Sequence, residues 1–373
     1  MIPSTIFQAD SESCFFMHHP THFTVPAIAD IGDATLTARL QHVLDHKTKP
    51  LGSLGRLERL ALRIGQVLGS EAPQLVQPQM VVFAGDHGLV ARGVSAYPSD
   101  VTWQMVENFL AGGAAVSVLA RQHGLALNVV DCGVARDIAP REVAPGQPRL
   151  WLRKVAPGTQ DASIGPAMGA AQCAQALANG MEVVRGLPGN ALLLGEMGIG
   201  NTSVASLLLA RLCGVSLQDC TGAGTGLDAA GIARKRAVLE QALAANAHAT
   251  APLDALAALG GFEVATMAGA VLQAAVERRV IVVDGFITTA AVLVAARLQP
   301  AVLQRCVFAH SSGEPGHALM LAQLQAEPLL DMGLRLGEGS GAALAWPLLQ
   351  SACAVLREMA SFEAAGVSQR GVA

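Results

Sequence analysis

The sequence predicts an α/β protein built around a parallel β-sheet that helices cover on both faces. Two observations indicate this class. The apolar runs are continuous rather than alternating, which is typical of strands that are buried on both faces. Each run leads into a Gly- or Asp-rich loop and then into a segment with helical periodicity, and this unit recurs along the chain. We therefore expect parallel strands joined by helices.

Five such units follow a linker marked by Pro73 and Pro78. In order, the runs and their loops are Met80–Ala84 with Gly85-Asp86-His87-Gly88, Ala126–Val130 with Asp131-Cys132-Gly133, Ala191–Leu194 with the loop at 195–200, Val280–Val283 with Asp284-Gly285-Phe286, and Cys306–Ala309 with the loop at 310–316. Ligands bind outside the carboxyl ends of the strands in such sheets, so we expect the site to lie among these loops.

The remaining segments are predicted to be mainly helical. Leu36–Leu68 has apolar residues at spacings of three and four, with a break at Lys49-Pro50. A sixth loop, Gly337–Gly341, precedes a helix that we expect to run to about Leu356. Residues 1–26 are interpreted as a flexible leader.

Composition excludes several classes of protein. Charged residues make up 14% of the 373 residues, against about 25% in an average soluble domain. The net charge of −4 gives no basic surface for nucleic acid. The apolar stretch Val280–Leu298 is interrupted by Asp284, Thr288 and Thr289, which argues against a membrane span. Met1–Pro20 has no Lys or Arg, so it does not match a signal peptide.

The cysteines indicate a reducing compartment. There are seven, and none forms a CxxC pair, so neither a disulfide framework nor a zinc site is indicated. We expect a soluble cytoplasmic protein that binds no metal.

Gly198-Ile199-Gly200-Asn201-Thr202-Ser203 is the best candidate for a phosphate site. Glycines let backbone N–H groups approach an anion, and the following helix presents the positive end of its dipole. Asn201 or Thr202 could equally be a simple helix cap. The loop lacks the third glycine of a dinucleotide site, which disfavours a dehydrogenase, and it lacks the Gly-Lys-Ser/Thr ending of a P-loop. Lys235 could reach a phosphate, although a solvated helix residue is the commoner role for lysine.

Two glutamates occupy unusual positions. Glu338 stands between two glycines before a helix, where a carboxylate is ordinarily stabilised by the helix dipole. Glu196 lies beside the candidate phosphate loop, where an acid would be repelled by an anion unless it serves a cationic group. The stretch Val282–Thr289 matches the diphosphate-ribose loop of the common phosphoribosyltransferases poorly, since Gly285 replaces the second acid.

The loops taken together are more specific than any one of them. They comprise the run at 49–58 (Lys-Pro-Leu-Gly-Ser-Leu-Gly-Arg-Leu-Glu), Ala84–Gly88, Val94–Pro98, Glu196–Thr202, Asp284–Phe286, Glu314–His317 and Leu336–Ala342. In this order they resemble the nicotinate-nucleotide–dimethylbenzimidazole phosphoribosyltransferase family, and the resemblance covers about 35–356.

The resemblance implies a reaction and a fold. Ribose 5-phosphate would pass from nicotinate mononucleotide to 5,6-dimethylbenzimidazole, giving α-ribazole 5′-phosphate and nicotinate for the lower ligand of cobalamin. A Rossmann-like large domain at 79–329 would carry the site, and a small helical domain would combine 27–78 with 330–373. The family resemblance also implies a homodimer. No cofactor is implied, because the leaving pyridinium needs neither a metal nor a general acid.

The resemblance also implies roles for individual residues. Glu338 matches the family's general base, which reverses the ordinary interpretation of that residue, and Glu196 is expected near the ribose. The backbone at 198–200, with Asn201 and Thr202, is expected to hold the 5′-phosphate, with Lys235 and Ser312 as helpers. Tyr97, Pro98 and Gln104 are expected in the pocket for the aromatic base. The alternatives are another nucleotide-dependent glycosyl transferase or phosphorylase, or a non-catalytic nucleotide-binding sensor.

Overall fold

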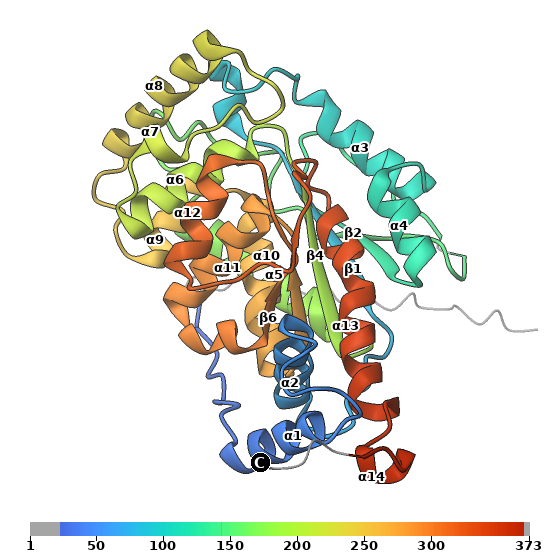
Figure 1. The fold of residues 1–373 in the computed structure, drawn as a ribbon. Coiled ribbons are helices and arrows are strands. Elements are labelled where there is room, and N and C mark those ends of the chain that lie inside the picture. The colour runs from blue at the N-terminus through green and yellow to red at the C-terminus, as the bar shows by residue number, and fades with distance from the viewer. Residues whose placement is uncertain (1–22, 143, 369–373) are drawn as a thin grey trace, which may run out of the picture.

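The computed structural model describes residues 23–142 and 144–368, and its centre is a six-stranded parallel sheet (Figure 1). The strands stand in the order β3-β2-β1-β4-β5-β6. They are β1 (Gln79–Gly85), β2 (Ala126–Gly133), β3 (Arg149–Leu152), β4 (Ala191–Met197), β5 (Val280–Val283) and β6 (Cys306–Phe308). A separate parallel pair is formed by β7 (His310–Ser311) and β8 (Leu330–Asp331).

Helices cover both faces of the sheet. One layer packs α5 (Ala170–Arg185), α6 (Asn201–Cys213), α9 (Pro252–Leu259), α10 (Phe262–Val276) and α11 (Phe286–Leu298) on one face, with α7 (Leu217–Cys220), α8 (Ala229–Ala245), η2 (Pro300–Arg305) and α12 (Pro315–Gln323) beyond them. The other face carries α1 (Ala34–Asp45), α2 (Arg56–Leu68), α3 (Asp100–Ala111), α4 (Ala115–His123) and α13 (Ser340–Glu358). The short η1 (Gly88–Arg92) follows β1, and α14 (Phe362–Ala365) comes last.

Alternate residues of each strand supply the two cores. In β1, Val81 and Phe83 belong to the core under α5 and α10, whereas Met80 and Val82 belong to the core under α2 and α13. All four side chains have no exposed surface. This double burial explains why the strand sequences are continuously apolar.

The strand order creates a switch point between β1 and β4. The chain moves outward from β1 through β2 to β3, then returns to the other side of β1 and moves outward again through β4, β5 and β6. The loops that follow β1 and β4 therefore leave their strands in opposite directions, and in open α/β sheets ligands bind in the crevice between such loops. All five predicted strand-end loops lie at this edge, as the sequence indicated.

The element boundaries confirm most of the predictions. The stretch at 280–298 divides into β5 and α11, and the helix after the glycine loop begins at Asn201. The break near Lys49-Pro50 is wider than expected, since α1 ends at Asp45 and α2 begins at Arg56. Residues 1–22 of the predicted leader lie outside the described part of the chain.

At one end of the molecule the segment after α1 pairs with the segment after α13. Thr48 N donates to Ala360 O at 3.0 Å, and Phe362 N donates to His46 O at 3.0 Å. Figure 1 shows α1, α2 and α13 together at this end of the molecule. The division into 27–78 plus 330–373 and 79–329 stays a prediction.

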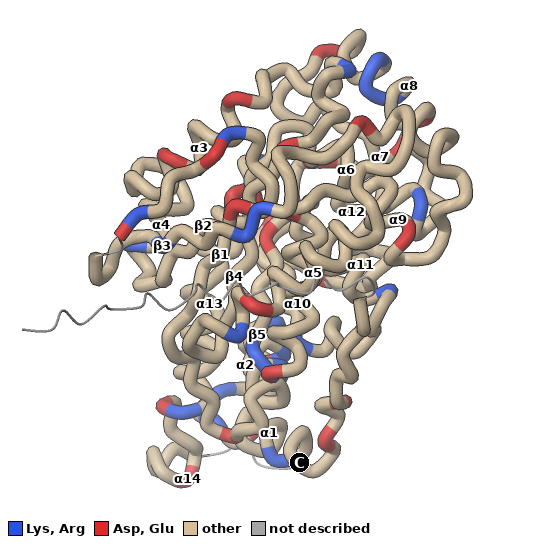
Figure 2. The backbone as a smooth tube through the Cα atoms, turned by 180° about the vertical axis from the view of Figure 1, so that it is seen from behind, with Lys and Arg blue, Asp and Glu red and all other residues tan. Residues whose placement is uncertain are grey.

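Charged positions are sparse along the backbone, and the two signs are interspersed (Figure 2). Among the described residues no helix is both long and apolar enough to cross a membrane.

The contact between α5 and α10 depends on two glycines. A Cβ on Gly180 would lie 1.8 Å from the carbonyl oxygen of Thr266, and a Cβ on Gly269 would lie 1.9 Å from that of Leu177. Since backbone cannot move aside as a flexible side chain can, these glycines set how closely the two helices approach.

We predict that Gly180→Ala lowers the free energy of unfolding by about 3 kcal/mol or more, because overpacking against a rigid backbone is costly. Chemical denaturation measures the loss. The control is Gly165→Ala, where no atom lies within 4 Å of the added Cβ. Equal stability of the two variants would contradict this account of the packing.

Candidate active site

Three carboxylates are buried together at the carboxyl edge of the sheet. Glu196 lies near the end of β4, Asp284 follows β5, and Glu338 precedes α13. Their exposed fractions are 6%, 1% and 7%. Burying three acids side by side is unfavourable unless hydrogen bonds or function compensate for it.

Glu338 has a backbone conformation that is rare for a residue with a side chain. Its φ is 65°, and its neighbours Gly337 and Gly339 have φ of 82° and 92°. A non-glycine residue held in this left-handed region is strained, and such strain persists where the surroundings impose it. Gly195 is part of those surroundings, since a Cβ there would lie 2.3 Å from the carbonyl oxygen of Glu338.

The other two carboxylates hold the backbone of this loop. The N–H of Glu338 donates to Glu196 Oε1 at 3.3 Å. The N–H of Gly339 donates to Asp284 Oδ2 at 3.3 Å, and that of Ala342 donates to Asp284 Oδ1 at 2.9 Å. These acids therefore cap the start of α13, where no side chain of the helix itself does so.

The carboxyl group of Glu338 itself remains available. Its Oε2 is buried and has no hydrogen-bond partner in the described part of the chain. Burial raises the pKa of Glu338 to about 7, and the negative charge of Asp284 adds to this, while the backbone amide of Val116 in the first turn of α4 opposes it. A carboxyl with a pKa near neutrality is suited to accept a proton at physiological pH.

The pKa of Glu196 is shifted further than that of Glu338. Burial raises its pKa to about 8, with a further contribution from Asp284, whereas hydrogen bonds from Asn201 and from the Glu338 backbone favour its charged form. Asn201 Nδ2 donates to Glu196 Oε2. Asn201 is the first residue of α6, so one side chain joins the glycine loop to the carboxylate cluster.

The glycine loop at 198–200 leaves backbone donors free. The amides of Ile199, Asn201 and Ser203 donate to Thr102 Oγ1, Gly198 O and Gly200 O respectively. The amides of Gly198, Gly200 and Thr202 have no acceptor among the described residues. They lie at the amino end of α6, where the helix dipole also favours an anion.

Lys235 is not the solvated helix residue that its sequence context suggested. It is 1% exposed, and its Nζ donates to Thr202 Oγ1 at 2.9 Å. Burial lowers the pKa of Lys235 to about 8, while Glu314 opposes the shift. The structure thus brings an ammonium group to the second residue of the helix that follows the glycine loop.

Ser312 is fixed by a buried histidine. Its N–H donates to His317 Nδ1 at 2.9 Å, so the ring proton sits on Nε2, which lies 3.0 Å from Thr289 Oγ1. Burial lowers the pKa of His317 to about 3, so this ring is neutral at physiological pH.

Tyr97, Pro98 and Gln104 lie beside or within α3 and are exposed, Tyr97 by 51%. Thr102 connects this segment to the glycine loop. Within the described residues no hydrogen bond or ion pair joins Tyr97, Pro98 or Gln104 to Glu338 or Glu196.

Sequence reasoning left several side chains of this region without a role. His87 and Glu263 form a fully buried pair with Nε2 and Oε1 3.0 Å apart, and His87 Nε2 would lie 3.1 Å from a Cβ on Gly198. The carboxylate of Glu263 and the charge of Asp86 raise the pKa of His87 against its burial. The turn containing His87 was visible in the sequence, but Glu263 lies inside an apolar helix and gave no signal.

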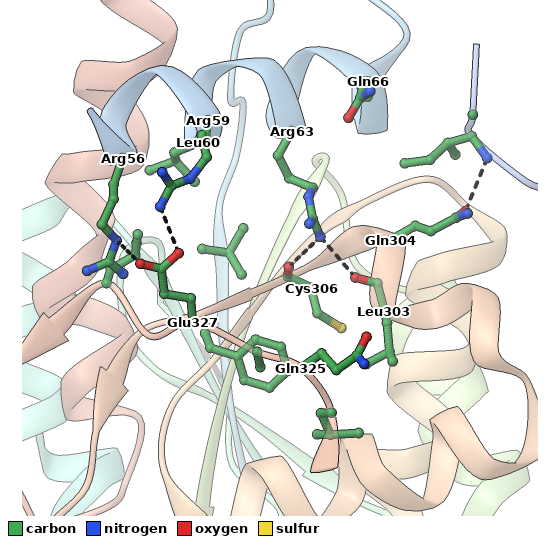
Figure 3. Close-up of a pocket in the computed structure, with 17 residues that line it drawn as sticks. Arg56, Arg59, Leu60, Arg63, Gln66, Leu303, Gln304, Cys306, Gln325 and Glu327 are labelled. Atoms are coloured by element: carbon green, nitrogen blue, oxygen red, sulfur yellow. Dashed lines mark hydrogen bonds and ion pairs between the residues drawn. The ribbon is translucent and has the colours of Figure 1, made fainter. Parts of the chain in front are cut away.

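A separate cavity of about 590 Å³ lies away from these carboxylates, between α2 and the start of β6 (Figure 3). Three arginines of α2 line it, and they already have partners. Arg56 and Arg59 pair with Glu327, and Arg63 donates to the carbonyl oxygens of Leu303 and Cys306. These contacts join α2 to the segments around β6.

Comparisons with known proteins agree with the fold. A family model described as phosphoribosyltransferase matches residues 30–367. The enzymes named nicotinate-nucleotide–dimethylbenzimidazole phosphoribosyltransferase from Variovorax paradoxus and Cupriavidus necator are 73% and 58% identical, over 93% and 92% of this chain and 98% of each relative. The crystal structure of CobT from Thermus thermophilus has a TM-score of 0.86 and 41% identity, covering 90% of this chain and 100% of that one.

An α/β fold with a glycine loop and buried acids at the switch point is thus that of a phosphoribosyl-transferring enzyme. The chain belongs to the nicotinate-nucleotide–dimethylbenzimidazole phosphoribosyltransferase family. The resemblance inferred from the ordered loops is confirmed.

We predict that the elevated pKa of Glu338 makes the protein less stable as pH rises. The folded state binds a proton up to about pH 7, whereas the unfolded glutamate releases it near 4.5, so stability falls between these values. Glu338→Gln removes this dependence and gains up to roughly 2 kcal/mol on the wild type between pH 5 and 8.

Denaturation at several pH values measures this difference. Glu182→Gln, at a glutamate whose side chain is 55% exposed, is the control and should follow the wild type. A constant difference between Glu338→Gln and the wild type across this range would contradict the assignment.

Proposed function

We propose that the protein transfers ribose 5-phosphate from nicotinate mononucleotide to 5,6-dimethylbenzimidazole, giving α-ribazole 5′-phosphate and nicotinate for the lower ligand of cobalamin. The observation that carries this proposal is the buried carboxyl of Glu338 at the switch point, which has a pKa near 7 and whose Oε2 has no hydrogen-bond partner among the described residues. The names of the relatives give the same substrates.

Glu338 is the general base in this proposal. One benzimidazole nitrogen attacks C1′ of the ribose, and the C1′–N bond to the pyridinium breaks with its electron pair going to the pyridine nitrogen. The other benzimidazole nitrogen then loses its proton to Glu338. Attack from the face opposite the leaving ring converts the β-nucleotide into the α-product.

Glu196 is proposed to act on the ribose. Positive charge develops at C1′ as the pyridinium leaves, and a nearby carboxylate stabilises it. That charge also favours the ionised form of Glu196, against the burial that raises its pKa. Asn201 orients the carboxylate through Oε2.

The 5′-phosphate is proposed to bind the amides at 198–202. The free N–H groups of Gly198, Gly200 and Thr202 supply donors, and Lys235 beside Thr202 supplies positive charge. Ser312 is a proposed additional donor. Tyr97, Pro98 and Gln104 are proposed to line the pocket for the aromatic base, because their segment adjoins the glycine loop through Thr102.

The reaction is proposed to take place in the cytoplasm. The described cysteines are free, and Cys132, Cys173, Cys220, Cys306 and Cys353 among them are buried. Reduced thiols are typical of proteins in that compartment.

A homodimer is also proposed. The proposal rests on the family resemblance described above. Light scattering should give about twice the chain mass of 38.4 kDa, and a mass near that of one chain would refute the dimer.

The direct test mixes the purified protein with nicotinate mononucleotide and dimethylbenzimidazole in the presence of a chelator. We expect α-ribazole 5′-phosphate and nicotinate in equal amounts. A folded protein that forms no α-product would refute the proposal.

We predict that Glu338→Gln lowers kcat by about 10²- to 10⁴-fold, the usual contribution of a general base. In the wild type, kcat/KM should rise with pH through a limb near 7 to 8, because Glu338 must be ionised to accept the proton and Glu196 must be ionised to stabilise the charge at C1′. Steady-state kinetics across pH 5–9 measures both effects, with Glu182→Gln as the control. Near-normal turnover by Glu338→Gln would show that another group is the base.

A further inference from the structure

We infer that Asp284 is a positioning residue, which holds Glu338 in its strained conformation and sets the pH at which it accepts a proton. This inference rests on the proposed role of Glu338. In the sequence, Asp284 stood out as part of a strand-end loop that matches a diphosphate-ribose loop poorly, and the proposed reaction gives it no substrate to bind.

Asp284 fixes the start of α13 through both of its carboxylate oxygens. Asp284 is 1% exposed, and its two oxygens accept from the amides of Gly339 and Ala342, on either side of the first turn of α13. Gly339 adjoins Glu338, so the carboxylate fixes the chain immediately after the base. Both oxygens are needed for this, since each accepts a different N–H.

The start of α13 packs closely against Asp284 at Gly341. A Cβ on Gly341 would lie 2.8 Å from Asp284 Oδ1 and 2.0 Å from His310 Cδ2. The start of α13 is thus pressed against both side chains with no room for an added methyl group. A glycine at this position is a condition for the carboxylate to reach the helix amides.

The charge of Asp284 acts on the two neighbouring glutamates. The titratable groups that face Asp284 and Glu338 are Glu196 on β4 and His310 on β7, and α4 contributes the backbone amide of Val116. The negative charge of Asp284 raises the pKa of both Glu196 and Glu338. Asp284 therefore acts on both proposed catalytic acids while it fixes the loop.

His310 favours the ionised form of Asp284. Burial raises the pKa of Asp284, and the electrostatic interaction with His310, whose Nε2 lies 3.7 Å from Asp284 Oδ1, opposes this. The backbone amides of Gly339 and Ala342 also favour the carboxylate.

The test is Asp284→Asn in the full-length protein, measured by kcat and by the acid limb of kcat/KM. The amide keeps one acceptor, but its NH₂ group faces a backbone N–H, so the loop loosens and kcat should fall at least about tenfold. Removing the negative charge lowers the pKa of Glu338, so the acid limb should move to lower pH by about half a unit or more.

The matched control is Asp131→Asn. Asp131 is also 1% exposed and lies at the carboxyl end of β2, where its Oδ1 accepts from Val134 N at 2.9 Å. This variant should lose stability but keep the wild-type kcat and acid limb.

Three results would overturn the inference. They are wild-type kcat in Asp284→Asn, a lower kcat with an unmoved acid limb, and an equal shift of the limb in Asp131→Asn. If Asp284→Asn does not fold, Asp284→Glu decides, because it keeps the charge but displaces the oxygens. That variant should lose kcat with little change in the acid limb, and wild-type kcat would refute the positioning role.

Failure of the proposed function has a different signature. In that case the wild type itself forms no α-product. The pH dependence of unfolding needs no substrate, and the difference between Asp284→Asn and the double variant Asp284→Asn/Glu338→Gln still reports whether the pKa of Glu338 is lowered. An unchanged dependence would overturn the inference independently of activity.

Discussion

The site depends on two buried carboxylates that accept hydrogen bonds from the backbone of a left-handed loop. Glu196 and Asp284 accept the amides of Glu338, Gly339 and Ala342, and these contacts hold Glu338 at a φ of 65°. Neither acid can be lost without freeing an amide at the start of α13. These hydrogen bonds compensate for the strain of the left-handed backbone. None of them uses the carboxyl group of Glu338, whose Oε2 has no hydrogen-bond partner among the described residues.

The same arrangement explains why so many glycines surround the site. Gly195 allows the carbonyl oxygen of Glu338 to lie against β4, and Gly341 allows α13 to lie against Asp284 and His310. Burial raises the pKa of Glu196 and of Glu338, and the charge of Asp284 close to both adds to this. Close backbone packing and a carboxyl group with a pKa near neutrality are thus two consequences of one geometry.

The strands, their parallel order and the glycine loops could be predicted from sequence because they depend on local apolar runs and turn residues. Catalytic roles were expected for Glu338 and Glu196 because the ordered loops resemble those of a known family, and these roles stay predictions. Contacts between distant segments could not be predicted in this way. Lys235 was expected in solvent because nothing local shows that it lies beside Thr202, and Asp284 and Glu263 act across the sheet on residues far away in sequence.

Glu338 is a buried acid whose pKa is raised to about 7 by burial and by the charge of Asp284. The most direct measurement is a ¹³C NMR titration of protein labelled at the glutamate side-chain carboxyl carbons, with the resonance assigned by its loss in Glu338→Gln. We expect the Glu338 resonance to show a transition near pH 7 that moves to lower pH when Asp284 is replaced by Asn. A Glu338 resonance that titrates near 4.5 in both proteins would contradict it.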